Sequence, residues 1–235
     1  FLLDCSGVAF TGAYVGSAFT TMMKQLFLMA AALSILCSLS YAEKHFTNRQ
    51  GEFYFLLLCS VLGMSLVTGA QNLILLVVCF ELMGIPLYVL AAFKRKDKLS
   101  VEGALKLYLV GAVSSVTMLY GMSLLFGLAG TSDIQEIART FYANKPPGAV
   151  LAASLTLAGI GFKIGIFPFH MWIPDTYEGA PTPVVAFISV APKVAGLAVL
   201  CQILMAHQGS LLSMAFALLN EVRPSGPSVH APARE

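Results

Sequence analysis

Long runs of hydrophobic residues, separated by short polar segments, dominate the chain from residue 18 onward. A helix needs roughly 20 apolar residues to cross a hydrocarbon core about 30 Å thick, and several runs approach that length. The regular alternation of apolar and polar residues that marks a membrane β-barrel does not occur in the sequence. We therefore predict an all-α, polytopic bundle of transmembrane helices. The predicted helices are 18–42, 53–69, 72–93, 101–129, 148–173 and 183–206, with a partial span at 1–16.

The pattern also predicts how the chain is organised. Residues 1–17 are expected to form the partial transmembrane segment and a loop, residues 18–208 the transmembrane domain, and residues 209–235 a short apolar run with a disordered tail. The run "SLLSMAFALLN" at 210–220 is too short to span, and the polar, proline-rich text after it is typical of disorder. The stretch "SDIQEIARTFY" at 132–142 has apolar residues at helical spacing and predicts a short helix on a membrane surface.

Composition narrows the class of protein. The chain is 57% hydrophobic and 11% charged, with a mean hydropathy of +0.80, whereas a soluble domain carries about 25% charged residues. This excludes an ordinary soluble enzyme. The net charge of +2 indicates no nucleic-acid partner. The five cysteines are scattered through apolar segments without a CxxC pair, so we interpret them as buried free thiols, with no metal or cofactor.

Positive charge differs between alternate loops. Loop 43–52 carries Lys44 and Arg49, and four of the five residues of "KRKDK" at 94–98 are Lys or Arg. The loops between them in sequence are poorer in these residues. The positive-inside rule then places loops 43–52, 94–98 and 174–182 on the cytoplasmic or matrix side, and the short helix on the opposite side.

Three ionisable residues lie deep inside predicted helices. Glu81 is nine residues into 72–93, Lys163 is ten residues from the end of its helix, and Lys193 is ten residues into 183–206. At about 1.5 Å per residue, each lies roughly 15 Å from a membrane face. Three such charges facing lipid would cost on the order of 8–10 kcal/mol, so we expect them to face one another or a hydrated interior. A proton relay, an ion pathway, a ligand counter-ion or a purely structural Glu–Lys pair would each account for them.

The helix that contains Lys163 is predicted to break near Pro168. Proline donates no backbone hydrogen bond and clashes with the carbonyl of Ile164, four residues earlier. Unwound backbone at membrane depth is tolerated where it is buried in protein or lines a cavity, and broken helices carry ion sites in transporters. Pro192 stands next to Lys193 in the following helix, so each of these two buried lysines has a proline close to it in the sequence.

Two other residues leave alternatives open, and two more have a single interpretation. Lys106 lies four residues after Glu102, a spacing that suits a local ion pair, but snorkelling or a role in proton movement fits it equally well. His170 either extends a proton path from the buried lysine or is simply hydrogen-bonded at the membrane edge. Trp172 is interpreted as an interfacial anchor. Asp175 is expected to be solvated in a loop.

Three stretches resemble a known family. They are "VCFELMGIPLYVLAAFKRKD", "EGALKLYLVGAVSS" and "GFKIGIFPFHMWIPDTYEGAPTPVVAFISVAPK". They resemble subunit N (subunit 2 in mitochondria) of proton-pumping NADH:quinone oxidoreductase, respiratory complex I, over about residues 18–206. Multisubunit cation/proton antiporters share the general form but usually have histidine where this chain has Tyr177.

The resemblance implies an antiporter-like fold and a role for each matching residue. It implies that Glu81 pairs with Lys163 of the broken helix, that Lys193 is the central lysine of the next helix, and that Lys106 matches a further family lysine. It also implies proton transfer without a bound cofactor, driven by redox chemistry in other membrane-arm subunits. The host would be an energy-transducing inner membrane, mitochondrial or bacterial, and the surrounding partners would include lipids.

The family's subunits have about fourteen helices in two inverted halves, whereas this chain matches only the first half. We therefore expect a fragment, or a subunit whose C-terminal half is a separate chain. A subunit of a cation/proton antiporter and a non-conducting structural half-subunit remain the alternative functions.

Overall fold

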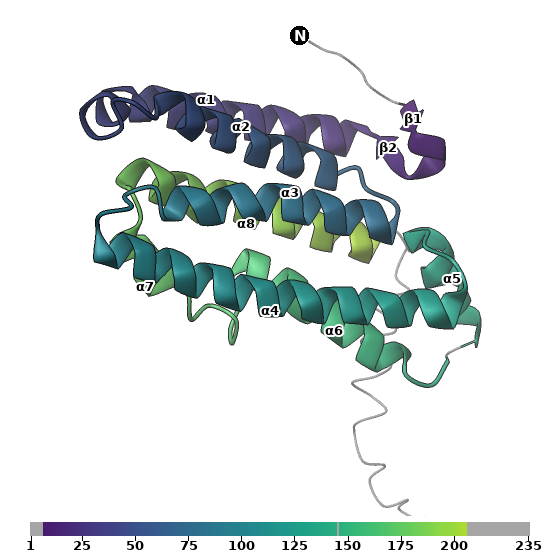
Figure 1. Cartoon of the computed structure of the whole chain (residues 1–235). Helices are drawn as coiled ribbons and strands as arrows, with labels where there is room; N and C mark the ends of the chain where they lie inside the picture. Colours follow the sequence, from purple (N-terminus) through teal and green to yellow (C-terminus); the bar gives the residue numbers. More distant parts are fainter. Residues whose placement is uncertain (1–6, 145, 206–235) are drawn as a thin grey trace, which may run out of the picture.

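The structure is a computed structural model that describes residues 7–144 and 146–205. Eight helices follow a short N-terminal hairpin in this part of the chain (Figure 1). They are α1 (Ala18–His45), α2 (Gln50–Val67), α3 (Leu73–Ala91), α4 (Lys98–Ala129), α5 (Ile134–Asn144), α6 (Ala149–Ile164), α7 (Ile173–Gly179) and α8 (Thr182–Met205). Among the described residues, α1, α2, α3, α4 and α8 are long and apolar enough to cross a membrane. The predicted polytopic helical fold is confirmed.

The partial span predicted at 1–16 is wrong over its described residues, which form a hairpin. Strands β1 (Gly7–Ala9) and β2 (Tyr14–Gly16) pair antiparallel around a 3-10 turn at Phe10–Gly12. Gly12 has a φ of +97°, which glycine adopts without strain. The hairpin docks on the α2–α3 loop through Val15 N–H donating to the Gly69 carbonyl at 2.9 Å. The predicted apolar run at 210–220 and the tail after it lie outside the described residues.

The helix predicted over 148–173 is broken, as the sequence indicates around Lys163 and Pro168. Helix α6 ends at Ile164, and Gly165 closes it in the left-handed conformation with a φ of +81°. Residues 166–172 are non-helical, and α7 begins at Ile173. The prediction of a loop at 174–182 is wrong over residues 174–179, because these residues belong to the short helix α7.

Helix α4 is the central support of the bundle. It packs along α6, α7 and α3, while α2 packs on α3, and α1 packs on α2 and α8. Figure 1 shows the long helices side by side, with α7 and α6 lying along different parts of α4. The largest fully buried side chains include one aromatic ring from each of several helices: Phe27, Phe53, Phe80, Phe162 and Phe187.

Small residues bring α2 close to α3 beside the charged site. A Cβ added at Gly63 would lie 2.5 Å from the backbone nitrogen of Met83. Ser60 Oγ donates to the carbonyl of Met83 at 3.0 Å. Such small-residue contacts are how membrane helices approach one another closely. They fix the middle of α3, which carries Glu81.

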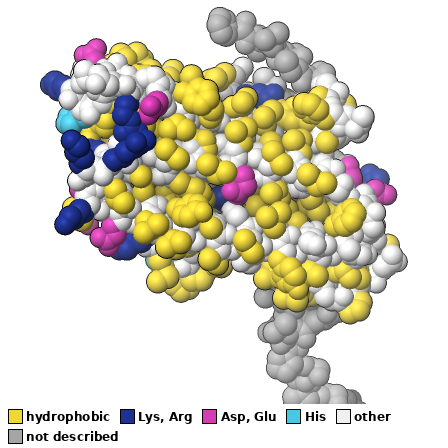
Figure 2. Space-filling model, in the orientation of Figure 1, with side chains coloured by type: hydrophobic (Ala, Val, Ile, Leu, Met, Phe, Trp, Pro, Cys, Tyr) yellow, Lys and Arg dark blue, Asp and Glu magenta, His cyan; other side chains and the backbone are white. Residues whose placement is uncertain are grey.

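The polar ends of the bundle differ in charge. The α1–α2, α3–α4 and α7–α8 connections lie at one end (Figure 1), and Lys and Arg side chains gather at that end of the face shown in Figure 2. Arg49 stacks there over the ring of Phe93 at 4.4 Å from its centroid. The predicted grouping of these loops at one end is thus confirmed. Their assignment to the cytoplasmic or matrix side stays a prediction.

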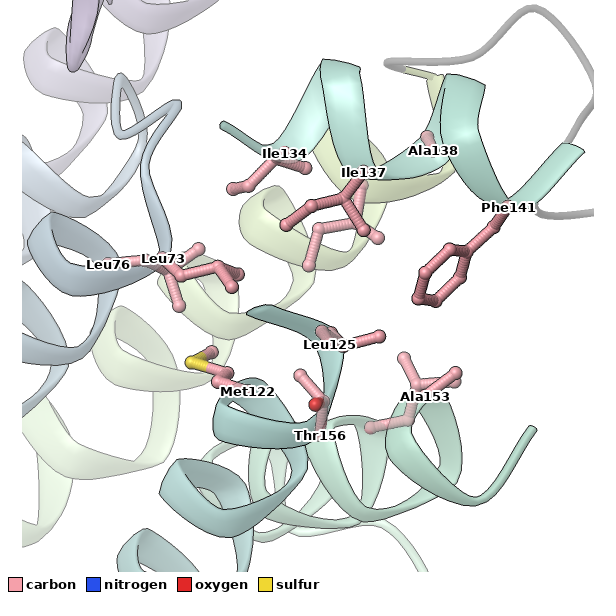
Figure 3. A pocket seen from close by; sticks show the side chains of 12 residues that line it. Leu73, Leu76, Met122, Leu125, Ile134, Ile137, Ala138, Phe141, Ala153 and Thr156 are labelled. Carbon is pink, nitrogen blue, oxygen red and sulfur yellow. The ribbon is translucent and has the colours of Figure 1, made fainter. Parts of the chain in front are cut away.

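Helix α5 caps the opposite end and matches the short helix predicted at 132–142. Its buried residues Ile134, Ile137, Ala138 and Phe141 point into an apolar pocket that Leu73, Met122 and Leu125 close from α3 and α4 (Figure 3). Its exposed positions include Gln135, Glu136 and Arg139. The apolar face of the amphipathic helix α5 therefore packs against the bundle, and its polar face is exposed.

Candidate functional site

An ion pair between α3 and α6 lies at the centre of the bundle. The Nζ of Lys163 is 3.6 Å from Oε1 of Glu81. The lysine side chain is only 4% exposed, and the glutamate is 30% exposed. A cation buried this deeply is costly unless a partner offsets the lost hydration. The carboxylate supplies that partner, so the two residues form one unit.

Two hydroxyl groups complete the surroundings of this pair. Ser115 of α4 donates to Oε1 of Glu81 at 2.6 Å. Lys163 donates to the hydroxyl of Tyr88, two turns after Glu81 in α3, at 3.3 Å. The same carboxylate oxygen therefore accepts a hydrogen bond and faces the ammonium group. Hydrogen bonds to charged groups are shorter and stronger than neutral ones, which holds the carboxylate in place.

The break in the helix has an electrostatic consequence for Lys163. This residue lies in the last turn of α6, whose unpaired carbonyl groups carry partial negative charge. A cation at that position is stabilised by the helix end as well as by Glu81. Gly84 of α3 leaves room for the ammonium group, because a Cβ there would lie 3.2 Å from Nζ. The break and the glycine together explain how a lysine fits at mid-bundle.

Lys193 of α8 lies on the other side of the break. Its Nζ is 5.4 Å from the ring centroid of Tyr177 in α7, within the range of a cation–π interaction. A Cβ at Gly165 would be 3.8 Å from its Cε, so the lysine stem passes next to the turn that ends α6. Within residues 7–144 and 146–205 it makes no ion pair with a carboxylate. Lys193 is thus near the break but separate from the Glu81 pair.

Lys106 belongs to a different cluster near the positively charged end of the bundle. It bonds Glu102 at 2.8 Å, as its spacing predicts, and also Asp175 of α7 at 3.1 Å. The lysine is 42% exposed, so water competes for all three groups. The expectation that Asp175 is merely solvated in a loop is wrong, because it ties α7 to α4.

His170 and Trp172 take opposite environments in the segment between α6 and α7. His170 is exposed, and its ring lies 5.7 Å from that of Phe167. Trp172 is 4% exposed and packs against Phe162 with ring centroids 5.6 Å apart. The interpretation of Trp172 as an interfacial anchor is therefore wrong, because the turn after α6 folds the indole back into the bundle.

The structure thus brings Glu81 and Lys163 together, places Lys193 across the break, and leaves Lys106 and His170 apart. The sequence interpretation missed Ser115 and Tyr88. The seven-residue spacing from Glu81 to Tyr88 puts both on one helix face and could have indicated the tyrosine. No group of three or more metal-binding side chains occurs among the residues that the structure describes.

These features define a class: a polytopic helical membrane protein with a buried acid–lysine pair at the break of a discontinuous helix. The chain belongs to the family described as NADH:quinone oxidoreductase/Mrp antiporter, transmembrane, whose model matches residues 70–221.

Similar proteins support the resemblance to subunit N. The chain is 42% identical over 210 residues to NADH-quinone oxidoreductase subunit N of Desulfitobacterium hafniense, covering 88% of this chain and 42% of that one. It is 45% identical over 201 residues to subunit N of Moorella thermoacetica, covering 85% of this chain and 42% of the relative. The chain thus spans less than half the length of these curated relatives.

Solved structures show the same fold. A chain of respiratory complex I from Thermus thermophilus, solved with bound aureothin, superposes with a TM-score of 0.72 at 32% identity. The match covers 94% of this chain and 49% of that one. A chain of an archaeal membrane-bound sulfane sulfur reductase has a TM-score of 0.71 at 24% identity, which shows the shared fold alone.

Proposed function

We propose that this chain is the first half of a proton-translocating membrane-arm subunit of an NADH:quinone oxidoreductase. The observation that carries the proposal is the buried ion pair between Glu81 and Lys163 at the break between α6 and α7. The identity to subunit N relatives supports the choice of complex. The subunit would hold no redox centre and would act on protons alone, in an energy-transducing inner membrane.

The geometry suggests how the pair handles a proton. While the two residues are 3.6 Å apart, the carboxylate stabilises the ammonium form of Lys163 against the cost of burial. Separation of the pair removes this attraction and favours release of the proton. Lys193, across the break, is the proposed next acceptor, and His170 and Lys106 are proposed stations closer to the exposed parts of the path. Other subunits supply the energy that moves the pair.

The remaining part of the proton path would come from partners. Because the relatives are more than twice as long as the matched region, a second set of helices, in the same protein or in a separate chain, is proposed to complete the path. Other membrane-arm subunits and lipids would cover the outer surface. Such partners also account for Glu81, which is 30% exposed in the chain alone.

Replacement of Lys163 by alanine tests the proposal. In the assembled complex, we expect Lys163→Ala to lower the number of protons pumped per NADH oxidised. Lys98→Ala removes an exposed lysine at the start of α4 and serves as the matched control. Both variants are compared in membrane vesicles after assembly is checked. Unchanged pumping per NADH in Lys163→Ala would reject the relay.

Two alternatives have distinct outcomes in the same vesicles. The family model also includes Mrp antiporters, and an antiporter subunit would exchange cations for protons without any need for NADH. A structural half-subunit would tolerate loss of Lys163 with full activity. The presence of Tyr177, at a position where antiporters usually carry histidine, favours the oxidoreductase.

A further inference from the structure

The ion pair at the helix break is longer than a direct charge-assisted hydrogen bond. The Nζ of Lys163 lies 3.6 Å from Oε1 of Glu81, whereas an ammonium group and a carboxylate in direct contact are about 2.7–2.9 Å apart. The same carboxylate oxygen already accepts a hydrogen bond of 2.6 Å from Ser115. The hydroxyl oxygen of Tyr88 is closer to Nζ than the carboxylate is, at 3.3 Å. The lysine is therefore shared between two groups of α3 and is not bound tightly to either.

The hydroxyl of Tyr88 occupies a space that two glycines leave open. A Cβ added at Gly111 of α4 would lie 2.5 Å from this hydroxyl oxygen, a separation at which the hydroxyl would have to move. A Cβ added at Gly84 of α3 would lie 3.3 Å from the same oxygen and 3.2 Å from Nζ of Lys163. Small residues on two helices thus leave room for this one hydroxyl beside the ammonium group.

The ring of Tyr88 limits where its hydroxyl can go. Tyr88 lies two turns after Glu81, so both side chains project from the same face of α3. Its ring packs edge-on against Tyr108 of α4, with ring centroids 5.9 Å apart. Tyrosine has only two side-chain torsions, so a ring held by its neighbour leaves the hydroxyl little freedom. Tyr88 therefore offers Lys163 a fixed second partner next to the carboxylate.

We propose that Tyr88 is a positioning residue, whose hydroxyl holds the ammonium group of Lys163 partly away from Glu81 and stays bonded to it when the pair opens. A buried ammonium group without a partner is costly, so a second acceptor makes separation of the pair easier. A hydrogen bond at the weak end of the range for charged groups changes the ratio of open to closed pairs about tenfold. The effect on pumping rests on the proposed proton transfer, whereas the position of the lysine does not.

Tyr88→Phe tests the position of the lysine directly, because it removes the hydroxyl and keeps the ring against Tyr108. In a high-resolution structure of the assembled complex, we expect Nζ of Lys163 to move onto Glu81 and the pair to shorten to about 2.7–2.9 Å. A lysine that stays at the wild-type distance from Glu81 would refute the role of Tyr88.

The rate of proton pumping provides a second test. In membrane vesicles that contain the assembled complex, we expect Tyr88→Phe to lower this rate by up to about tenfold, because the tightened pair opens less often. Tyr120→Phe removes the hydroxyl of an exposed tyrosine of α4 and should leave the rate unchanged. Equal rates in the two variants would overturn the proposal.

A hydroxyl returned from position 84 separates positioning from packing. In the Tyr88→Phe background, Gly84→Ser places a hydroxyl on a Cβ 3.2 Å from Nζ of Lys163, beside the space that the tyrosine oxygen vacates. Gly84→Ala adds the same Cβ without the hydroxyl and is the matched control. We expect Gly84→Ser, but not Gly84→Ala, to restore pumping; equal pumping in the two double variants would count against the proposal. Normal pumping in Lys163→Ala, together with a shortened pair in Tyr88→Phe, would reject the proposed function and leave the placement of the lysine by Tyr88 standing.

Discussion

The close contact between α4 and α7 provides a quantitative test of how the broken helix is held. A Cβ added at Gly103 would lie 2.5 Å from the carbonyl oxygen of Asp175 and 3.1 Å from its carbonyl carbon. These are backbone atoms, which cannot rotate away as a flexible side chain can. Thr176 Oγ1 also donates to the carbonyl of Gly103 at 3.2 Å in the same buried contact. We therefore expect Gly103→Ala to push α7 away from α4.

The size of the effect follows from two opposing contributions. Overpacking a tight contact costs typically about 1–3 kcal/mol. Alanine is better than glycine inside a helix by roughly 0.5–1 kcal/mol. Gly103→Ala should therefore lower the free energy of unfolding by up to about 2.5 kcal/mol. The displaced α7 also carries Asp175 away from Lys106, which weakens their ion pair.

Gly127 of the same helix is the matched control. A Cβ there meets nothing within 4 Å, so Gly127→Ala should stabilise the chain by the propensity gain alone. Both variants are unfolded in detergent micelles with a chemical denaturant, and the unfolding midpoints are compared with the wild type. The difference between the two variants removes the shared propensity contribution. If Gly103→Ala proves as stable as Gly127→Ala, the close α4–α7 contact is refuted.

Two further predictions concern side chains of α4 and α7. Ser115→Ala removes the hydroxyl that donates to Glu81, a charge-assisted hydrogen bond of about 1.5–3 kcal/mol. We therefore expect this variant to slow proton pumping. Thr117→Ala is the control and should leave pumping unchanged, because the Thr117 hydroxyl bonds only within α4. Equal pumping rates in the two variants would contradict the role of Ser115. Asp175→Asn should make the thermal midpoint less sensitive to added salt, because it removes an exposed ion pair with Lys106 that salt screens. A salt response equal to that of the wild type would show that this pair adds nothing to stability.

The hydrophobic pattern predicts the long helices because their length and apolar content depend on local sequence alone. The break near Pro168 is equally local, since proline and Gly165 disrupt the helix whatever surrounds them. The hairpin at residues 7–16 is different. Its form depends on Val15 docking against Gly69, more than fifty residues away, so an apolar run there resembles a partial span.

The candidate site shows the same division between local and distant information. The cost of burying charge indicates that Glu81 and Lys163 have a partner, and the structure confirms that each is the other's. Ser115 gives no such signal, because a serine in a membrane helix most often bonds within its own helix. Asp175 is next to polar residues in the sequence, so its pairing with Lys106 emerges only from the packing of α7 on α4.

Helix α4 connects these separate contacts. It supplies Ser115 to the carboxylate of Glu81, Lys106 to Asp175, and the carbonyl of Gly103 to Thr176. The first contact acts on the acid of the buried pair, and the other two act on the segment that follows the break. A displacement of α4 along its axis would therefore alter the hydrogen bond to Glu81 and the position of α7 together. Because α4 also packs along α6, it would act on Lys163 as well. In the proposed proton transfer, α4 is therefore the helix that connects the surroundings of Glu81 with α6 and α7.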